Sequence, residues 1–309
     1  MTSQIDVAAT ERFAGYEALC PWHHRQPFAD GVQEPRLITR KDALYCSGLP
    51  ERQEPVWMYV STHRVNAGTL FVQPGEGFEP GDHPGPEPYY CLRGELELGN
   101  PDTGSSIRIK AGDAANIPAL AQHWARNVGE EPAEVIWWVP GEMHTDEWKE
   151  KIHKGVGKWY EREPVTFDGP RDRNEGFTSH LDDLGSWPPA RPARLPYDMH
   201  HLPRSTWLHM LHGTDRRRTI LVSFFYCDER IRIAKLQIPH SGETEPRSGD
   251  YERLLYVESG TLSVTLVGTG QGIVAEPGDM VFLPPHTEHC LQAIDVGPVT
   301  ALSAWALAA

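Results

Sequence analysis

The chain repeats one pattern of glycine, aspartate, proline and histidine at a constant offset of 166 residues. The first copy reads YYCLRGELEL at 89–98 and KAGDAANIPALAQHWARN at 110–127, and the second reads LLYVESGTLSV at 254–264 and EPGDMVFLPPHTEHCLQA at 276–293. A period this long excludes a solenoid of short repeats and predicts a duplicated domain. Five pairs keep the offset: Gly94 and Gly260, Gly112 and Gly278, Asp113 and Asp279, Pro118 and Pro284, His123 and His289.

Each copy has the pattern of β-sheet. The chain has 28 glycines and 27 prolines, which favour short strands joined by tight turns over long helices. A helix is expected mainly at 145–155, where Thr145 can cap the first turn and Gly155 can end the last. Apolar and β-branched runs of strand length lie between turn residues at 55–61, 68–73, 133–139, 219–226 and 231–238.

Composition narrows the classes of partner. The 29 Lys+Arg against 43 Asp+Glu leave a net charge of −14, which argues against a nucleic-acid or anionic-membrane partner. We see no apolar run of about 20 residues and no signal peptide. The five cysteines form no CxxC pair, which fits a reducing cytoplasm. We therefore expect a cytoplasmic protein that binds a small-molecule substrate and is a monomer or a homodimer.

The repeated residues resemble the two motifs of the cupin superfamily, whose members are small jelly-roll barrels. The family patterns are G(x)5HxH(x)3–4E(x)6G and G(x)5PxGxxH(x)3N. A glycine stands where the first histidine is expected, and a leucine where the second motif has glycine. The first copy follows these motifs with Gly75, Gly81, His83, Glu87 and Gly94, then Gly112, Pro118, Leu120, His123 and Asn127.

The resemblance implies a metal site in the first copy, with His83, Glu87 and His123 as ligands. The spacing agrees, because residues an even number apart on a strand share a face, and a barrel can bring a later strand across its interior. Two imidazoles and a carboxylate suit a divalent ion and leave positions open for substrate. We expect one divalent metal ion per chain, with Fe(II) favoured and Mn, Zn or Ni possible.

The second copy departs from the motifs. At the constant offset His83 corresponds to Gly249 and Glu87 to Arg253, although a local bulge could bring Glu252 into place. Only His289 survives, and one imidazole does not hold a catalytic ion. We predict a structural second barrel with a degenerate site.

These patterns divide the chain into four parts. We predict an all-β bicupin, with two double-stranded β-helix (jelly-roll) barrels and few short helices. The parts are an N-terminal arm (1–50), the metal-binding barrel (51–142), a linker with a short helix and a proline-rich stretch (143–205) and the degenerate barrel (206–309).

Further side chains are expected at the first site. Continuing from Glu87 with period two places Tyr89 on the ligand face, and the same count from the second histidine places Asn127 inward. One of Trp137 and Trp138 should point into the barrel. We predict Glu87 and Tyr89 as catalytic groups, and Tyr89, Asn127 and Trp137 as substrate-binding groups; core packing is the alternative for each aromatic residue.

Three functions remain open. The leading prediction is a metal-dependent oxygenase, of the dioxygenase type, acting on a small organic acid or phenolic compound in the first barrel. In the alternative, a lyase or isomerase, the metal acts as a Lewis acid while Tyr89 or Glu87 moves protons. The third is a metal-free small-molecule-binding bicupin, which Gly81 favours.

Overall fold

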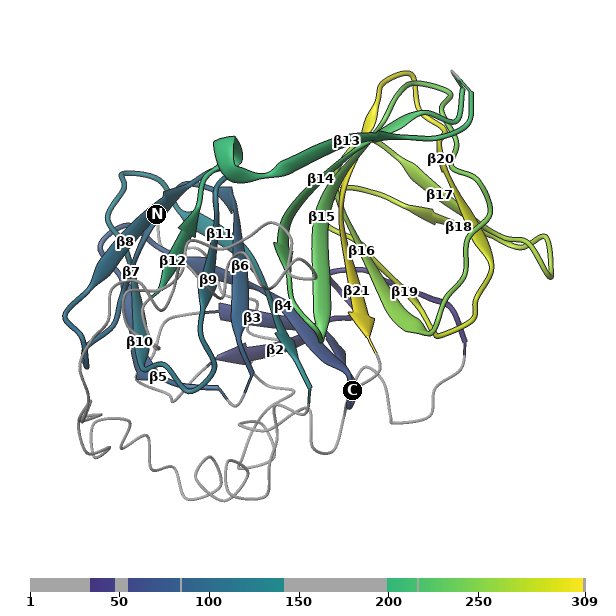
Figure 1. The fold of residues 1–309 in the computed structure, drawn as a ribbon. Helices are drawn as coiled ribbons and strands as arrows, with labels where there is room; N and C mark the ends of the chain where they lie inside the picture. Colours follow the sequence, from purple (N-terminus) through teal and green to yellow (C-terminus); the bar gives the residue numbers. More distant parts are fainter. Residues whose placement is uncertain (1–33, 48–54, 84, 142–198, 216, 308–309) are drawn as a thin grey trace. The chain divides into compact units, whose positions relative to one another are not determined.

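The computed structural model describes residues 34–47, 55–83, 85–141, 199–215 and 217–307. The chain divides into two compact units, and nearly every ordered element in them is a strand (Figure 1), so the all-β prediction is confirmed. The one short helix of the described ranges is the 3-10 turn η2 (Arg204–Thr206). The helix expected at 145–155 lies outside the described residues. Within the described ranges no helix is long and apolar enough to span a membrane.

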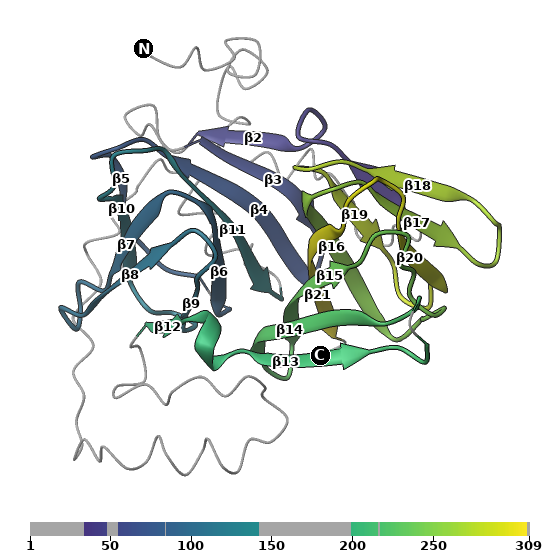
Figure 2. The same ribbon diagram turned by 90° about the horizontal axis from the view of Figure 1, so that it is seen from above.

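Unit 1, described at 43–141 and 199–203 apart from the gaps above, contains two antiparallel sheets that lie across from each other (Figure 2). The seven-stranded sheet has the order β12-β9-β6-β11-β4-β3-β2, with β2 (Leu44–Ser47), β3 (Pro55–Ser61), β4 (Val65–Val72), β6 (Glu87–Arg93), β9 (Ala114–Ile117), β11 (Ala133–Pro140) and β12 (His200–Leu202). The four-stranded sheet has the order β5-β10-β7-β8, with β5 (Gly77–Gly81), β7 (Glu95–Gly99), β8 (Ser106–Lys110) and β10 (His123–Asn127).

Unit 2, described at 34–42 and 204–307 apart from residue 216, repeats this arrangement. Its seven-stranded sheet has the order β1-β19-β16-β21-β15-β14-β13, with β1 (Arg36–Ile38), β13 (Leu208–His212), β14 (Ile220–Cys227), β15 (Ile231–Ile238), β16 (Tyr251–Ser259), β19 (Met280–Leu283) and β21 (Val299–Leu307). Its three-stranded sheet has the order β18-β17-β20, with β17 (Leu262–Leu266), β18 (Gly272–Ala275) and β20 (His289–Ala293).

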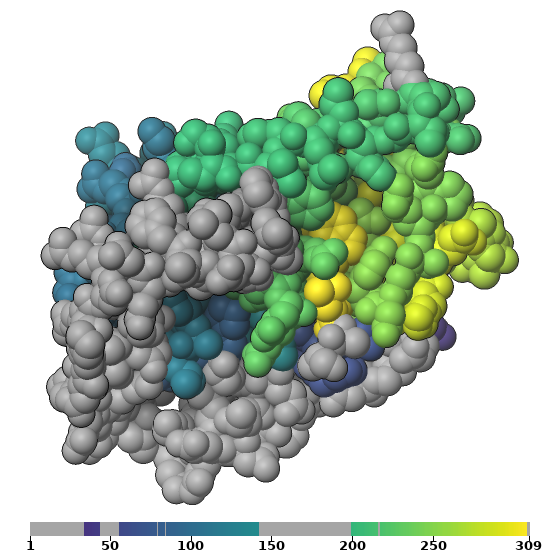
Figure 3. Space-filling model, viewed as in Figure 1, coloured from purple at the N-terminus to yellow at the C-terminus, as the bar shows by residue number. Residues whose placement is uncertain are grey.

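Short strands from the expected arm and linker complete the larger sheets. β1 pairs with β19 in unit 2, whereas β2, a few residues later, pairs with β3 in unit 1. β12, from the expected linker, pairs with β9 in unit 1. Such strands cover sheet edges that would otherwise expose unpaired backbone groups. The other edge of unit 2 is β13, whose Met210 and Leu211 are exposed on the surface shown in Figure 3.

The duplication extends to backbone geometry. The amide of Gly112 donates to the carbonyl of Cys91 at 2.7 Å, and the amide of Gly278 donates to the carbonyl of Val257 at 2.9 Å. Both glycines have positive φ, +88° and +93°, which a residue without Cβ adopts at little cost. The repeated glycines are therefore kept by one turn that occurs once in each barrel.

A second pair of contacts fixes the correspondence around the site. The amide of Leu120 donates to the carbonyl of His83, and the amide of His286 donates to that of Gly249, both at 2.8 Å. Leu120 and His286 both have φ near +60°, the left-handed region that the family glycine would suit. The offset of 166 residues therefore pairs His83 with Gly249 in three dimensions, with no shift of register between the two copies.

Each barrel packs its apolar side chains inward with period two. In unit 1 the interior cluster takes Tyr89 and Cys91 from β6 and Trp137 from β11. In unit 2 it takes Leu255 and Val257 from β16, with alternate residues of β21 and β20. This alternation defines the interior face of each strand, and the residues that carry the chemistry lie on it.

Candidate metal centre

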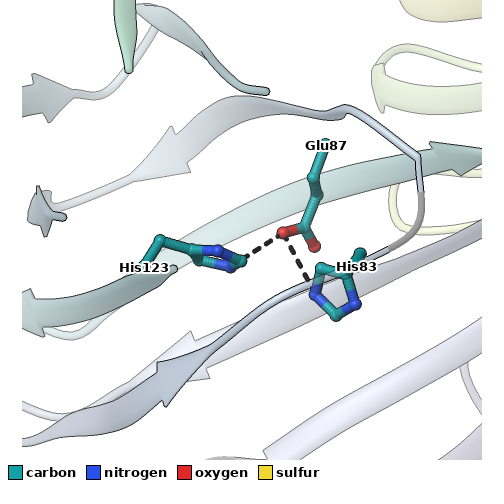
Figure 4. A group of neighbouring side chains, drawn as sticks. All are labelled: His83, Glu87 and His123. Carbon is teal, nitrogen blue, oxygen red and sulfur yellow. Dashed lines mark ion pairs between the residues drawn. The ribbon is translucent and has the colours of Figure 1, made fainter. Parts of the chain in front are cut away.

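Three side chains of unit 1 converge on one point at the interior edge of the barrel (Figure 4). His83 follows β5, Glu87 is the first residue of β6 and His123 is the first residue of β10. Glu87 Oε2 lies 3.3 Å from His83 Nε2 and 3.1 Å from His123 Nε2. The ligand atoms of all three lie within 4.8 Å of one another. The structure thus brings together the three residues predicted as metal ligands.

Backbone contacts between the flanking segments hold the two histidines close. His123 lies directly opposite Gly81 in the β5–β10 pairing. The Leu120 amide donates to the His83 carbonyl, and the Gln122 side-chain amide donates to Asp82 at 3.1 Å. The first histidine of the family pattern would therefore have projected beside His123, and Gly81 offers no ligand there.

The ring of His123 is held in one orientation. Its Nδ1 lies 3.0 Å from the carbonyl oxygen of Ala121. A carbonyl only accepts hydrogen bonds, so Nδ1 carries the proton and Nε2, which faces Glu87, has its lone pair in the neutral ring. A backbone partner of this kind is how metal-binding histidines are commonly oriented.

The carboxylate and the imidazoles influence one another strongly. Burial would raise the pKa of the Glu87 carboxyl, but the adjacent His83 and His123 lower it to about 2. Burial would lower the pKa of His83, but Glu87, with a smaller effect of Asp82, raises it. Glu87 is therefore anionic at neutral pH, as a metal ligand must be.

The donor set fits a divalent ion. Oε2 of Glu87 is buried and makes no well-aligned hydrogen bond to a described residue, although two ring nitrogens face it. Electron pairs that converge this closely require a proton or a cation between them. An ion that binds nitrogen and oxygen at about 2.1 Å keeps neighbouring ligand atoms about 3.0 to 3.4 Å apart. The distances of 3.1 and 3.3 Å fall in this range.

Tyr89 and Trp137 lie on the interior face but are packed in the core. Tyr89 is 2% exposed, Trp137 is 4% exposed, and the two are cross-strand neighbours on β6 and β11. A Cβ at Gly68 would lie 2.7 Å from the Trp137 ring, so the ring needs a glycine on β4. The catalytic and substrate-binding roles expected of these residues stay predictions; in this structure they close the barrel beneath the metal-binding group.

Asn127 braces a turn. Its side-chain nitrogen donates to the carbonyls of Val72 at 2.8 Å and Glu131 at 2.7 Å, and its oxygen accepts from the Gly129 amide at 2.9 Å. These bonds occupy the amide group, so they do not support the substrate-binding role that remains predicted for it.

In unit 2 the corresponding position holds a cation. Arg253 Nη1 lies 2.7 Å from His289 Nε2, and the expected counterparts Gly249 and Arg247 add no metal ligand. The strand keeps its register, so Glu252 does not take the place of Arg253. Sequence reasoning recorded Arg253 only as a lost ligand; its even spacing from the apolar Leu255 and Val257 was the signal that it faces inward.

Comparison with known proteins agrees with this architecture. A family model described as Cupin domain matches residues 68–139 and 235–305. No curated protein sequence matches the chain. Three similar solved structures are AerE from Microcystis aeruginosa (13% identity, TM-score 0.56, covering 86% of this chain and 98% of that one), a formate complex of oxalate decarboxylase from Lactobacillus farciminis (16%, 0.60, 90% and 87%) and an oxalate decarboxylase variant from Bacillus subtilis (15%, 0.58, 91% and 79%). At these identities the likeness shows a shared fold.

Proposed function

The chain is a bicupin of the cupin superfamily, and from this premise we propose that unit 1 is the catalytic half of a metal-dependent enzyme. The observation that carries the proposal is the convergence of His83, Glu87 and His123 on one buried point. Two imidazoles and one carboxylate form the ligand set typical of non-haem Fe(II) oxygenases, and three protein ligands leave positions open for other molecules. The proposed activity is an oxygenase acting on a small organic acid or phenolic compound.

The protein's own residues prepare the site for that chemistry. A bound divalent ion would supply Lewis acidity toward a substrate carboxylate or hydroxyl and, as Fe(II), a redox partner for O₂. His83 is the most exposed of the three ligands, with 15% of its side chain accessible, so substrate approaches from its side. Tyr89 and Trp137 exclude water from the opposite side, because both are buried.

A lyase is the second candidate, and one observation favours it. Oxalate decarboxylases are among the similar solved structures, and they act on a small dicarboxylate. On this alternative Glu87 and the two imidazoles hold the ion while the substrate loses a group without consuming O₂.

Oxygen uptake separates the two candidates. The protein loaded with Fe(II) is incubated with a panel of phenols, keto acids and dicarboxylates, and both oxygen consumption and substrate loss are followed. We expect a substrate whose loss is matched by oxygen consumption, and no turnover in Glu87→Gln. Substrate loss under argon at the same rate would reject the oxygenase and favour the lyase. The absence of turnover with every substrate class, in protein that holds its metal, would count against both.

A further inference from the structure

The interior of unit 2 has the opposite charge from that of unit 1. Arg253 lies on the interior face of β16, two positions before Leu255 in the core cluster, and it is 6% exposed. Ser303 and Trp305 lie on the same face of β21, and His289 begins β20. We propose that these residues form a binding site for a small organic carboxylate, with Arg253 as its cationic group.

The guanidinium has hydrogen-bond donors to spare. Its Nε donates to Ser303 Oγ at 3.1 Å and its Nη1 donates to His289 Nε2 at 2.7 Å. His289 can accept because its Nδ1 lies 2.7 Å from the Thr287 carbonyl and therefore carries the ring proton. Arginine has five N–H groups in a planar fork. Nη2 makes no hydrogen bond to any described residue, which leaves an edge of the fork for a ligand.

No protein carboxylate balances this charge. Arg253 forms no ion pair with a described carboxylate, and Glu252 faces the other side of the strand by the pleat. Arg247, which pairs with His289 across a β-bridge, adds a second positive charge nearby. A buried charge costs free energy unless it is paired. An anion bound at Nη2 would supply that pairing.

The pKa of Arg253 agrees with a cation of this kind. Burial lowers it to about 10, with Arg247 acting in the same direction and Tyr251 opposing them. The group therefore keeps its charge at neutral pH, because its pKa remains well above 7. Both positive groups remain available to an anion under ordinary conditions.

Aromatic rings around the guanidinium suit a carboxylate with a flat apolar body. The Trp305 ring lies under Arg253, with 5.0 Å from the guanidinium carbon to the ring centroid, and Phe224 lies 5.7 Å from Trp305. The Tyr251 ring covers Gly249, because a Cβ there would lie 2.2 Å from it. Arginine fixed over an aromatic ring presents its donors at the edge, where a carboxylate meets two of them at once.

The equivalent position in unit 1 shows how this arrangement is accommodated. Ser303 stands 166 residues after Trp137, so a hydroxyl replaces the indole that closes the first barrel. The smaller side chain leaves volume on the interior face, and its oxygen orients Arg253 through Nε. Unit 2 therefore exchanges a cation-binding carboxylate for a guanidinium while keeping the histidine beside it.

Calorimetric titration with benzoate tests this site. The full chain carrying Glu87→Gln is used as the parent, so that benzoate has no metal to bind in unit 1 and the result does not depend on the proposed enzyme activity. We expect saturable binding of one benzoate per chain, and none of benzyl alcohol, which has the same ring without the carboxylate. Arg253→Met and Arg253→Lys should each weaken binding at least tenfold, since lysine lacks the planar fork.

A matched control is Arg217→Met, which removes an exposed guanidinium paired with Glu243 at 3.8 Å and should leave benzoate affinity unchanged. Arg253→Lys keeps the charge and so serves if the methionine variant does not fold. The proposal is overturned if the parent shows no saturable binding. Benzoate affinity within twofold of the parent in the folded Arg253 variants would overturn it too.

Discussion

At the residue scale, the two barrels place opposite charges beside the same histidine. Glu87 lies 3.1 Å from His123 in unit 1, and Arg253 lies 2.7 Å from His289 in unit 2. Each histidine directs its Nδ1 to a backbone carbonyl two residues earlier, so the rings are oriented alike. The side chain opposite the ring then decides which kind of ligand the barrel attracts.

The pH dependence of stability reports on this pairing in unit 2. Burial and the Arg253 charge together lower the pKa of His289 from 6.5 to about 4. As pH falls from 6.5 toward 4, the unfolded chain takes up a proton that the folded chain does not. The free energy of unfolding therefore decreases, by about 2 to 3 kcal/mol at pH 4.5.

Chemical denaturation of the metal-free protein at pH 7 and pH 4.5 measures the effect. His289→Gln keeps an acceptor for Arg253 but cannot titrate, so it should lose about 2 kcal/mol less than the native chain over the same interval. Equal losses in the two proteins would show that His289 does not titrate as the structure implies.

At the element scale, the strands that the sequence predicted are those with long, clear patterns. The runs at 55–61 and 231–238 are β3 and β15 with the same bounds. β1 and β12 have three residues each, too few for a period, and their partners lie far away along the chain. Pairing of that kind is decided by tertiary structure, so local patterning could not reveal it.

The candidate site was predictable to a similar degree. Its three ligands followed from a motif that each strand start carries, and the structure brings them together. The bonds of Asn127 and the packing of Trp137 against Gly68 depend on neighbours from other strands, which spacing along one strand cannot supply.

The turn that precedes β19 yields a prediction about backbone strain. Gly278 has φ of +93°, and a Cβ added there would meet no atom within 4 Å, so alanine would cost only backbone energy. Gly278→Ala should lower the free energy of unfolding by about 1 to 2 kcal/mol. Gly272→Ala in β18 is the control, because Gly272 has equal space and no positive φ. A cost in urea denaturation that is the same for both variants would refute the turn's role.

At the scale of the whole molecule, duplication produced two barrels of one architecture with different interiors. The same turns, the same hydrogen bonds around residues 120 and 286, and the same apolar alternation recur in each unit. Only unit 1 brings together at least three cation-binding groups among the described residues. The account therefore assigns the metal to one barrel and leaves the other to a different ligand.

Metal content per chain tests that assignment most directly. Protein produced with iron, manganese and zinc supplied is purified without chelator and measured by elemental analysis, together with His123→Ala and His289→Ala. The account predicts about one ion per chain in the native protein and in His289→Ala, and less than about 0.2 in His123→Ala. Native metal content in His123→Ala, or a comparable loss from His289→Ala, would contradict it.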